Sequence, residues 1–277
     1  MPFTRRQKNE QKYYNTLVQD KWRDKDLYVS KEAPSFASYS SDLFDQAKIY
    51  LGELANKKVL ELACGSGEIS VWLAKQGAIV QGIDISDKSI ALAQKRALEN
   101  QEQVNFQISS AEKTPFKNNT FDIVFINVSL HHLEIGPALQ EIKRVLKPGG
   151  FFIAVEPFTP SPLIEKIRSS SLFQVFFPVR RETPDERILE PRDLKMIQHY
   201  FNFVESRTFR LFSSFVFKTK PLFHFFSFLY PGKLDFETKK RKTNSFFQTM
   251  DSFVLYSLPF TRLFSRYLVF RAQKEKD

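Results

Sequence analysis

Short apolar runs alternate with helical stripes along the first 160 residues. The runs have the length of strands buried on both faces, and they lie at Val59–Leu62, Ala78–Ile85, Val104–Ile108, Phe121–Val128 and Phe151–Val155. Between them, apolar residues recur at the spacing of amphipathic helices. Strands that alternate with helices in this way predict an α/β fold with a mostly parallel sheet.

A glycine turn joins the first run to its helix. From Val59 the chain reads VLELACGSGEI, and the second run reaches Asp84 and Ile85, with Asp84 lying 19 residues after Gly65. Glycine lets backbone approach a ligand with no Cβ in the way, so we expect Gly65 and Gly67 to lie against one. A strand, a glycine turn, a helix and a strand ending in a carboxylate are typical of nucleoside-binding sheets, in which the acid binds the ribose hydroxyls.

The glycine pattern narrows the kind of nucleoside. A dinucleotide site needs a third glycine, and Ser70 occupies that position. Read from the strand, the pattern is acid-x-Ala-x-Gly-x-Gly, which runs from Glu61 through Ala63 to Gly65 and Gly67. It resembles motif I of the class I S-adenosylmethionine-dependent methyltransferases, with Ala63 in place of the usual first glycine. A glycine turn that binds no ligand is the alternative interpretation.

Later stretches match the same family in order. The fourth run resembles motif IV, and an L-K-P-G-G turn precedes the fifth. Methyltransferases of this kind have an acid for the adenine amino group where this chain has Ser110, so a hydroxyl or backbone contact is expected instead. The resemblance covers about residues 55–157 and implies S-adenosylmethionine as cofactor. The residues that it implies for the cofactor site are Glu61, Ala63, Gly65, Gly67, Asp84, Ile85, Ser110, Ala111 and Asn127, with Asn127 over the methionine part.

The family implies a Rossmann-like, doubly wound, seven-stranded sheet, mostly parallel. We predict a helix at Pro191–Phe201, an edge strand at Phe203–Phe209 and a last, antiparallel strand at Arg266–Arg271. Ser86 is expected to cap the helix after Asp84, and Arg96 to lie on its outer face. The domains expected are residues 1–54 as N-terminal helices, 55–158 as the cofactor-binding core and 159–277 as the rest of the sheet, with a helical, Phe-rich cap inserted at about 211–265. Residues 4–27 are either a surface helix or a lid over the cofactor.

Two histidines follow the fourth run, at the rim where open sheets bind ligands. His131 or His132 is a candidate general base, because imidazole is matched to proton transfer near neutral pH. The alternative is a structural role in the loop. The histidines show no metal-ligand spacing, so no metal is expected. Asn127-Val128-Ser129-Leu130 does not resemble the motif of methyltransferases that act on planar amino groups.

Charge and phenylalanine concentrate after residue 160. The chain has a net charge of +10, and residues 161–277 hold 21 Lys and Arg, 12 Asp and Glu, and 20 of the 30 Phe. The phenylalanines are interpreted as a cap core, as the lining of an apolar pocket or, beside Lys239–Lys242, as a contact with an anionic membrane. No RNA-binding module is recognisable, so nucleic acid is not an expected partner.

The cysteine content and the apolar stretches of the sequence bear on the location of the protein. Cys64 is the one cysteine, and neither a secretory signal nor an apolar stretch of about 20 residues occurs, so a reducing, cytoplasmic location is expected.

We predict methyl transfer to an oxygen or nitrogen of a small, fairly apolar metabolite. The alternatives are a methyltransferase for a membrane-embedded lipid or quinone, and a catalytically silent cofactor-binding protein. The oligomeric state is left open.

Overall fold

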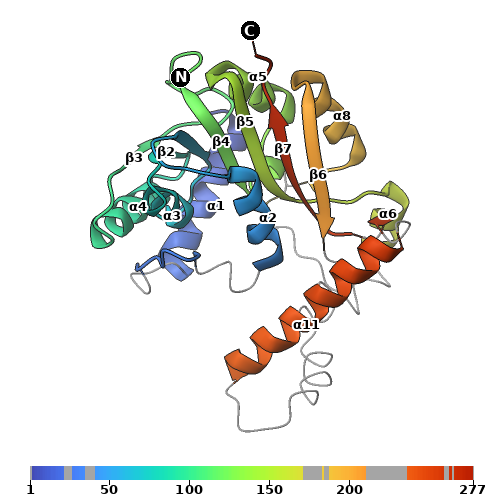
Figure 1. The fold of residues 1–277 in the computed structure, drawn as a ribbon. Helices are drawn as coiled ribbons and strands as arrows, with labels where there is room; N and C mark the ends of the chain where they lie inside the picture. The colour runs from blue at the N-terminus through green and yellow to red at the C-terminus, as the bar shows by residue number, and fades with distance from the viewer. Residues whose placement is uncertain are drawn as a thin grey trace.

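A seven-stranded sheet forms the centre of the computed structural model (Figure 1). The structure describes residues 2–21, 27–34, 41–170, 183, 187–209, 236–258, 262–263 and 265–276. The strands are β1 (Lys58–Leu62), β2 (Ile79–Asp84), β3 (Val104–Ile108), β4 (Phe121–Asn127), β5 (Leu146–Pro157), β6 (Phe203–Phe209) and β7 (Tyr267–Gln273). The helices are α1 (Arg5–Lys21), α2 (Ser41–Leu51), α3 (Glu68–Lys75), α4 (Asp87–Glu99), α5 (Ile135–Val145), α6 (Pro162–Arg168), α8 (Pro191–Tyr200) and α11 (Phe236–Ser257), with a 3-10 turn, η2, at Leu130–His132.

The strand order is β3-β2-β1-β4-β5-β7-β6, and β7 alone among these seven strands runs antiparallel to the other six. The predicted fold class is therefore confirmed. Strand β1 pairs in parallel with both β2 and β4, so the direction of winding reverses between β1 and β4. Ligands of open α/β sheets bind at this switch point, beyond the carboxyl ends of the strands.

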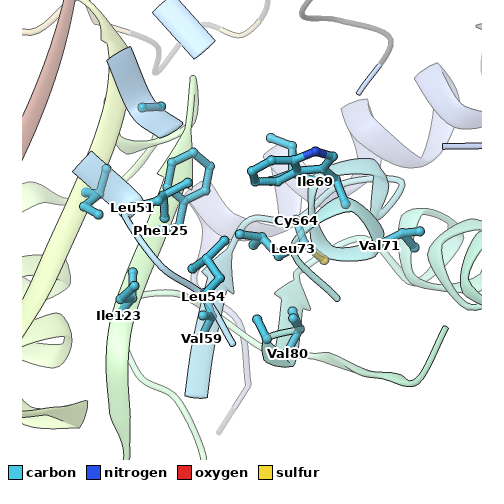
Figure 2. Close-up of a cluster of buried hydrophobic side chains, with 14 of the residues drawn as sticks. Leu51, Leu54, Val59, Cys64, Ile69, Val71, Leu73, Val80, Ile123 and Phe125 are labelled. Atoms are coloured by element: carbon cyan, nitrogen blue, oxygen red, sulfur yellow. The ribbon is translucent and has the colours of Figure 1, made fainter. Parts of the chain in front are cut away.

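Helices cover both faces of the sheet. One hydrophobic cluster joins α2, α3 and α4 to alternate residues of the strands, and it includes Leu51, Val59, Leu73 and Phe125 (Figure 2). A second cluster joins α5 and α8 to the opposite face. Strands with both faces covered need near-continuous apolar runs, which explains why the sequence predicts them clearly.

The predicted helix and strands after residue 190 are confirmed as α8, β6 and β7. One boundary differs, because β5 starts at Leu146 and includes the L-K-P-G-G stretch that was expected to be a turn. Leu146 pairs with Phe121, and the pairing register then shifts before Ile123 pairs with Phe151. Gly149 has a positive φ of 75°, so an irregularity at this glycine lets the strand begin earlier.

The C-terminal insertion is described only at α11 and beside β7. Helix α11 falls inside the predicted helical cap, and most other cap residues, including 211–235, lie outside the described part of the chain. Within the described residues, none of the helices combines the length and apolar character that crossing a membrane requires.

Candidate functional site

Asp84 fixes the geometry of the glycine turn. Its carboxylate accepts the backbone N–H of Gly65 at 2.9 Å and that of Ser86 at 2.8 Å, one on each oxygen. Burial raises the pKa of Asp84, while these backbone hydrogen bonds act in the opposite direction. The end of β2 is thereby tied to the turn after β1, and Asp84 ends its strand as the sequence predicts. Ser86 also caps α4, accepting the N–H of Ser89 at 2.9 Å.

Gly67 is required by protein packing, and its contact with a ligand stays a prediction. A Cβ there would lie 2.6 Å from Ala93 Cβ and 2.8 Å from Phe106 Cζ. The same Phe106 ring fills the space beside Gly82, where a Cβ would lie 2.6 Å from Phe106 Cδ1. Gly67 also has a φ of 73°. The turn therefore packs directly on α4 and β3, and Gly82 is a second glycine that this packing needs.

Glu61 lies under the first turn of α3. Its carboxylate accepts a hydrogen bond from the hydroxyl of Ser70, the residue at the position of a dinucleotide site's third glycine. Burial raises the pKa of Glu61 to about 8, although the Ser70 hydrogen bond lowers it, and the nearby charge of Asp84 raises it further. The motif acid therefore connects β1 to α3 from inside the protein.

Arg96 lies inside the protein, which corrects its predicted place on the outer face of α4. It is 8% exposed, and Nη1 donates to the backbone oxygen of Ser66 and, at 2.6 Å, to the Ser66 hydroxyl. Burial lowers the pKa of Arg96. A helical stripe of apolar residues gives no signal for this contact, because a long side chain reaches the turn from the border of the stripe.

Two residues at this edge of the sheet adopt left-handed backbone without being glycine. Ala63 follows β1 with a φ of 52°, and Val128 follows β4 with a φ of 51°. Such conformations cost energy, most for a β-branched residue, and they cluster at ligand sites. Beside Val128, the side-chain oxygen of Asn127 is buried and has no hydrogen-bond partner in the described part of the protein. An acceptor left open at the switch point fits an amino group such as that of a methionine moiety.

Helix α1 crosses the carboxyl ends of β2 and β3. Gln7 Nε2 donates to Ser110 Oγ at 2.8 Å, and Gln11 Nε2 donates to the backbone oxygen of Ile85 at 2.6 Å. One turn further, Asn15 Nδ2 donates to Asp87 Oδ1 at 2.7 Å. These α1 residues are spaced four apart, so one polar face covers two of the predicted cofactor residues. No sequence pattern marks these three residues, because glutamine and asparagine carry no signal for contacts with residues 72 to 103 positions away.

Ser110 belongs to a closed network. Besides accepting from Gln7, it donates to Glu112, whose carboxylate is also bound by the Arg6 guanidinium. Burial raises the pKa of Glu112, but Ser110 and Arg6 outweigh this and lower it below the usual value. The adjacent Ala111 is buried. The hydroxyl of Ser110 is thus engaged by protein groups, which favours a backbone contact for an adenine amino group at this strand end.

His131 and His132 lie together in η2 with their ring centroids 4.2 Å apart, but they have different partners. His131 Nδ1 lies 2.7 Å from Glu156 Oε2, and the other oxygen of Glu156 accepts the backbone N–H groups of Ser129 and Leu130. His131 therefore belongs to a buried network that fixes the loop. His132 instead faces α1, where Tyr14 Oη lies 3.1 Å from Nε2.

Comparison with known proteins identifies the core. Residues 60–154 match the family model described as a methyltransferase domain. An uncharacterised methyltransferase of Synechocystis is 39% identical over 108 residues, which are 38% of this chain and 49% of that protein. A demethylmenaquinone methyltransferase of Lactiplantibacillus plantarum is 38% identical over 129 residues, 44% of this chain and 53% of that protein. The chain thus spans about half the length of these curated relatives.

Solved structures share the fold across nearly the whole chain. A geranyl diphosphate C-methyltransferase of Streptomyces coelicolor, in complex with S-adenosyl-L-homocysteine, has a TM-score of 0.56 at 16% identity and covers 99% of this chain and 100% of its own. A [4+2]-cyclase has a TM-score of 0.60 at 19% identity and covers 99% and 97%. Residues 60–154 therefore form a methyltransferase domain, and the solved structures show that the chain has the fold of class I methyltransferases.

Proposed function

We propose that this protein transfers a methyl group from S-adenosylmethionine to a small, fairly apolar acceptor. One observation carries the proposal: the glycine turn, Asp84 and the open oxygen of Asn127 meet at the ends of adjacent strands β2, β1 and β4. Asp84 would hold the ribose and Asn127 the methionine amino group. When bound, the cofactor supplies a methyl group attached to a positively charged sulfur. The sulfur leaves as a neutral thioether and needs no acid to do so.

The chain's own residues then position the acceptor and exclude water. In-line displacement needs the acceptor's electron pair about 3–3.5 Å from the methyl carbon, so alignment supplies much of the rate. Helix α1 lies across this edge of the sheet through Gln7, Gln11 and Asn15, which supports the proposal that it is a lid. The inserted cap would complete the acceptor site.

The test begins with the cofactor. Titration calorimetry should show binding of S-adenosylhomocysteine, with NAD as the control ligand. Release of S-adenosylhomocysteine from S-adenosylmethionine is then measured with hydroxyl and amine acceptors. Tight NAD binding with none of S-adenosylhomocysteine contradicts the proposal. Cofactor binding without methyl transfer to any acceptor supports the third interpretation, a catalytically silent binding protein. The [4+2]-cyclase is an example of this fold in a protein named for another reaction.

A second candidate, a methyltransferase for a membrane-embedded quinone or lipid, has its own support. The curated relatives include demethylmenaquinone methyltransferases. On α11, Phe253 is 70% exposed and Tyr256 is 82% exposed, and the helix contains the basic run Lys239–Lys242. Aromatic and basic groups together favour an anionic lipid surface, where each cation contributes about 1 kcal/mol.

Vesicle sedimentation separates the two candidates. Vesicles with phosphatidylglycerol should retain the protein at low salt and release it at high salt. Changing Lys239–Lys242 to serine should abolish the retention, whereas Lys57→Ser, on the turn before β1, serves as the matched control. Equal amounts in the supernatant with and without vesicles would leave the small-metabolite enzyme as the proposal.

A further inference from the structure

A buried polar cluster lies where α1 meets the loop after β4. At its centre, His132 Nε2 lies 3.1 Å from Tyr14 Oη, while Nδ1 lies 3.4 Å from Glu10 Oε2 and 3.4 Å from Thr183 Oγ1. A hydroxyl, an imidazole and a carboxylate therefore follow one another in space. This order of groups draws a proton from a hydroxyl onto an imidazole and stabilises the resulting cation.

Glu10 is unusual for a carboxylate on a polar helix. It is 2% exposed, and neither oxygen has a well-aligned hydrogen bond from the described part of the protein. Burial raises its pKa, but contacts with His132 and Thr183 and the charges of His132 and Arg6 outweigh this, so the pKa lies below the usual value. Glu10 is thus ionised at neutral pH. A buried anion without direct hydrogen bonds is costly unless a cation forms beside it.

His132 is the group that can form this cation. Arg6 is already bound to Glu112, and its Nη1 donates to the backbone oxygen of His132 and not to the ring. His131 faces His132 with its ring, but its Nδ1 is paired with Glu156. The titratable and charged groups around His132 are therefore Arg6, Glu10 and Tyr14 from α1, His131 from η2, Glu156 from β5 and Glu112 after β3. Of these, Glu10 supplies the carboxylate paired with the His132 ring.

We propose that Tyr14, His132 and Glu10 accept the proton of a hydroxyl group on the methyl acceptor, which makes the acceptor a hydroxyl compound. The inference rests on the proposed methyltransferase function. The acceptor hydroxyl gives its proton to Tyr14 Oη while Tyr14 gives its own proton to His132 Nε2, and the imidazolium faces Glu10. The electron pair left on the acceptor attacks. It forms the new bond to the methyl carbon as the carbon–sulfur bond breaks, and that bond's electron pair stays on sulfur.

The position of the cluster agrees with this role. It follows Asn127 and Val128 at the end of β4, beside the residue proposed to hold the methionine moiety. Two of the three groups come from α1, so the site is complete only when this helix lies over the sheet edge. Removal of a hydroxyl proton assists methylation at that oxygen and, in a phenol, at a ring carbon. The proposed relay therefore specifies the functional group of the acceptor and not the atom that is methylated.

The first measurement uses 1,4-dihydroxynaphthalene as the hydroxyl probe and 1-naphthylamine as its amine counterpart. Tyr14→Phe should lower kcat for the hydroxyl probe by about 10²-fold, the lower range for a proton-transfer group. Glu10→Gln should lower kcat by about 10-fold and move the acid limb of the kcat/KM profile to lower pH, because the imidazolium loses its anion. Tyr13→Phe is the matched control, since Tyr13 contacts the Tyr14 ring at 5.2 Å but is not part of the relay.

The second measurement needs no acceptor. Nitrogen-15 NMR of the complex with S-adenosylhomocysteine should show the His132 ring nitrogen signals moving in Glu10→Gln and unmoved in Tyr13→Phe, because Glu10 Oε2 lies 3.4 Å from His132 Nδ1. Unmoved signals in Glu10→Gln overturn the pairing and therefore the inference.

The outcomes separate the inference from the function on which it rests. Methyl transfer to 1-naphthylamine alone overturns the inference and leaves the methyltransferase in place. Turnover of Tyr14→Phe and of Glu10→Gln within about two-fold of the unaltered protein also overturns the inference and leaves the methyltransferase in place. Absence of transfer to both probes, with no binding of S-adenosylhomocysteine, removes the proposed function and the inference together.

Discussion

The glycine turn after β1 and the loop after β4 lie at the same edge of the sheet, but different interactions hold them. Backbone groups and close packing hold the turn: Asp84 accepts two backbone N–H groups, and Phe106 fills the space beside Gly67. Buried carboxylates hold the loop, with Glu156 arriving from β5 and Glu10 from α1. The turn therefore depends on close packing at Gly67 as well as on one carboxylate, whereas two buried carboxylates hold the loop.

This difference predicts different responses to substitution. The turn should lose stability when atoms are added at Gly67, because this glycine faces packed side chains. The loop should respond to the loss of a carboxylate charge. Each experiment below tests one side of that contrast.

The largest effect is expected from Gly67→Val. The added Cβ would lie within 3 Å of Ala93 and Phe106, and valine disfavours a φ of 73°. We expect a loss of about 3–5 kcal/mol in the free energy of unfolding by denaturant, from overpacking and backbone strain together. Gly136→Ala is the control, because nothing lies within 4 Å of a Cβ there, and its stability should be unchanged or slightly higher. Unaltered stability in Gly67→Val would contradict the packing seen here.

Glu61→Gln sharpens the contrast, because burial is the largest influence on the pKa of this acid below the turn. With its pKa raised to about 8, Glu61 stays protonated in the folded chain while the unfolded chain ionises it from about pH 5 upward. Unfolding then releases a proton, so stability should fall by about 1.4 kcal/mol per pH unit in this window, or about 2–3 kcal/mol from pH 5.5 to 7.5. The amide cannot ionise, so the variant should lose this slope in denaturant melts. The same slope in both proteins would show that Glu61 is ionised when folded.

Asp84→Ala tests the link between the turn and the ligand. The substitution removes the acceptor of the Gly65 and Ser86 N–H groups and the group proposed for the ribose. Binding of S-adenosylhomocysteine should weaken by about 2 kcal/mol, or about 30-fold, in calorimetry. Asp122→Ala, whose carboxylate binds Lys147 and the backbone of Lys58 away from the turn, should leave the affinity unchanged. Equal affinities for all three proteins would place the ligand elsewhere.

Glu156→Gln should give the smallest change and should leave the turn untouched. The amide oxygen can still accept from Ser129 and Leu130, while the amide nitrogen faces His131 and the charge is lost. We expect the free energy of unfolding to fall by about 1.5 kcal/mol, the lower value for hydrogen bonds to charged groups. Cofactor affinity should stay the same. A large loss of affinity with unchanged stability would mean that the loop belongs to the cofactor side.

The contrast also explains what the sequence could predict. Gly65, Asp84 and Asn127 follow strands at regular intervals, so chain order alone brings them to one edge of a parallel sheet. The partners of His132 could not be found in this way, because Glu10 and Tyr14 lie more than a hundred residues earlier on a helix with few apolar residues. Arg96 was misplaced for a related reason, since a helix pattern reports the direction of Cα–Cβ bonds and not the reach of a long side chain.

The way the chain enters and leaves the cap has a consequence for evolution and engineering. Phe209 at the end of β6 pairs with Tyr267 at the start of β7, and the N–H of Arg266 donates to the oxygen of Phe209 at 3.0 Å. The long segment between them therefore departs from and returns to one point of the sheet. Doubling the length of such a closed segment costs only about 0.6 kcal/mol in loop entropy. A segment closed in this way can be lengthened or replaced while the pairing of β6 with β7 stays intact.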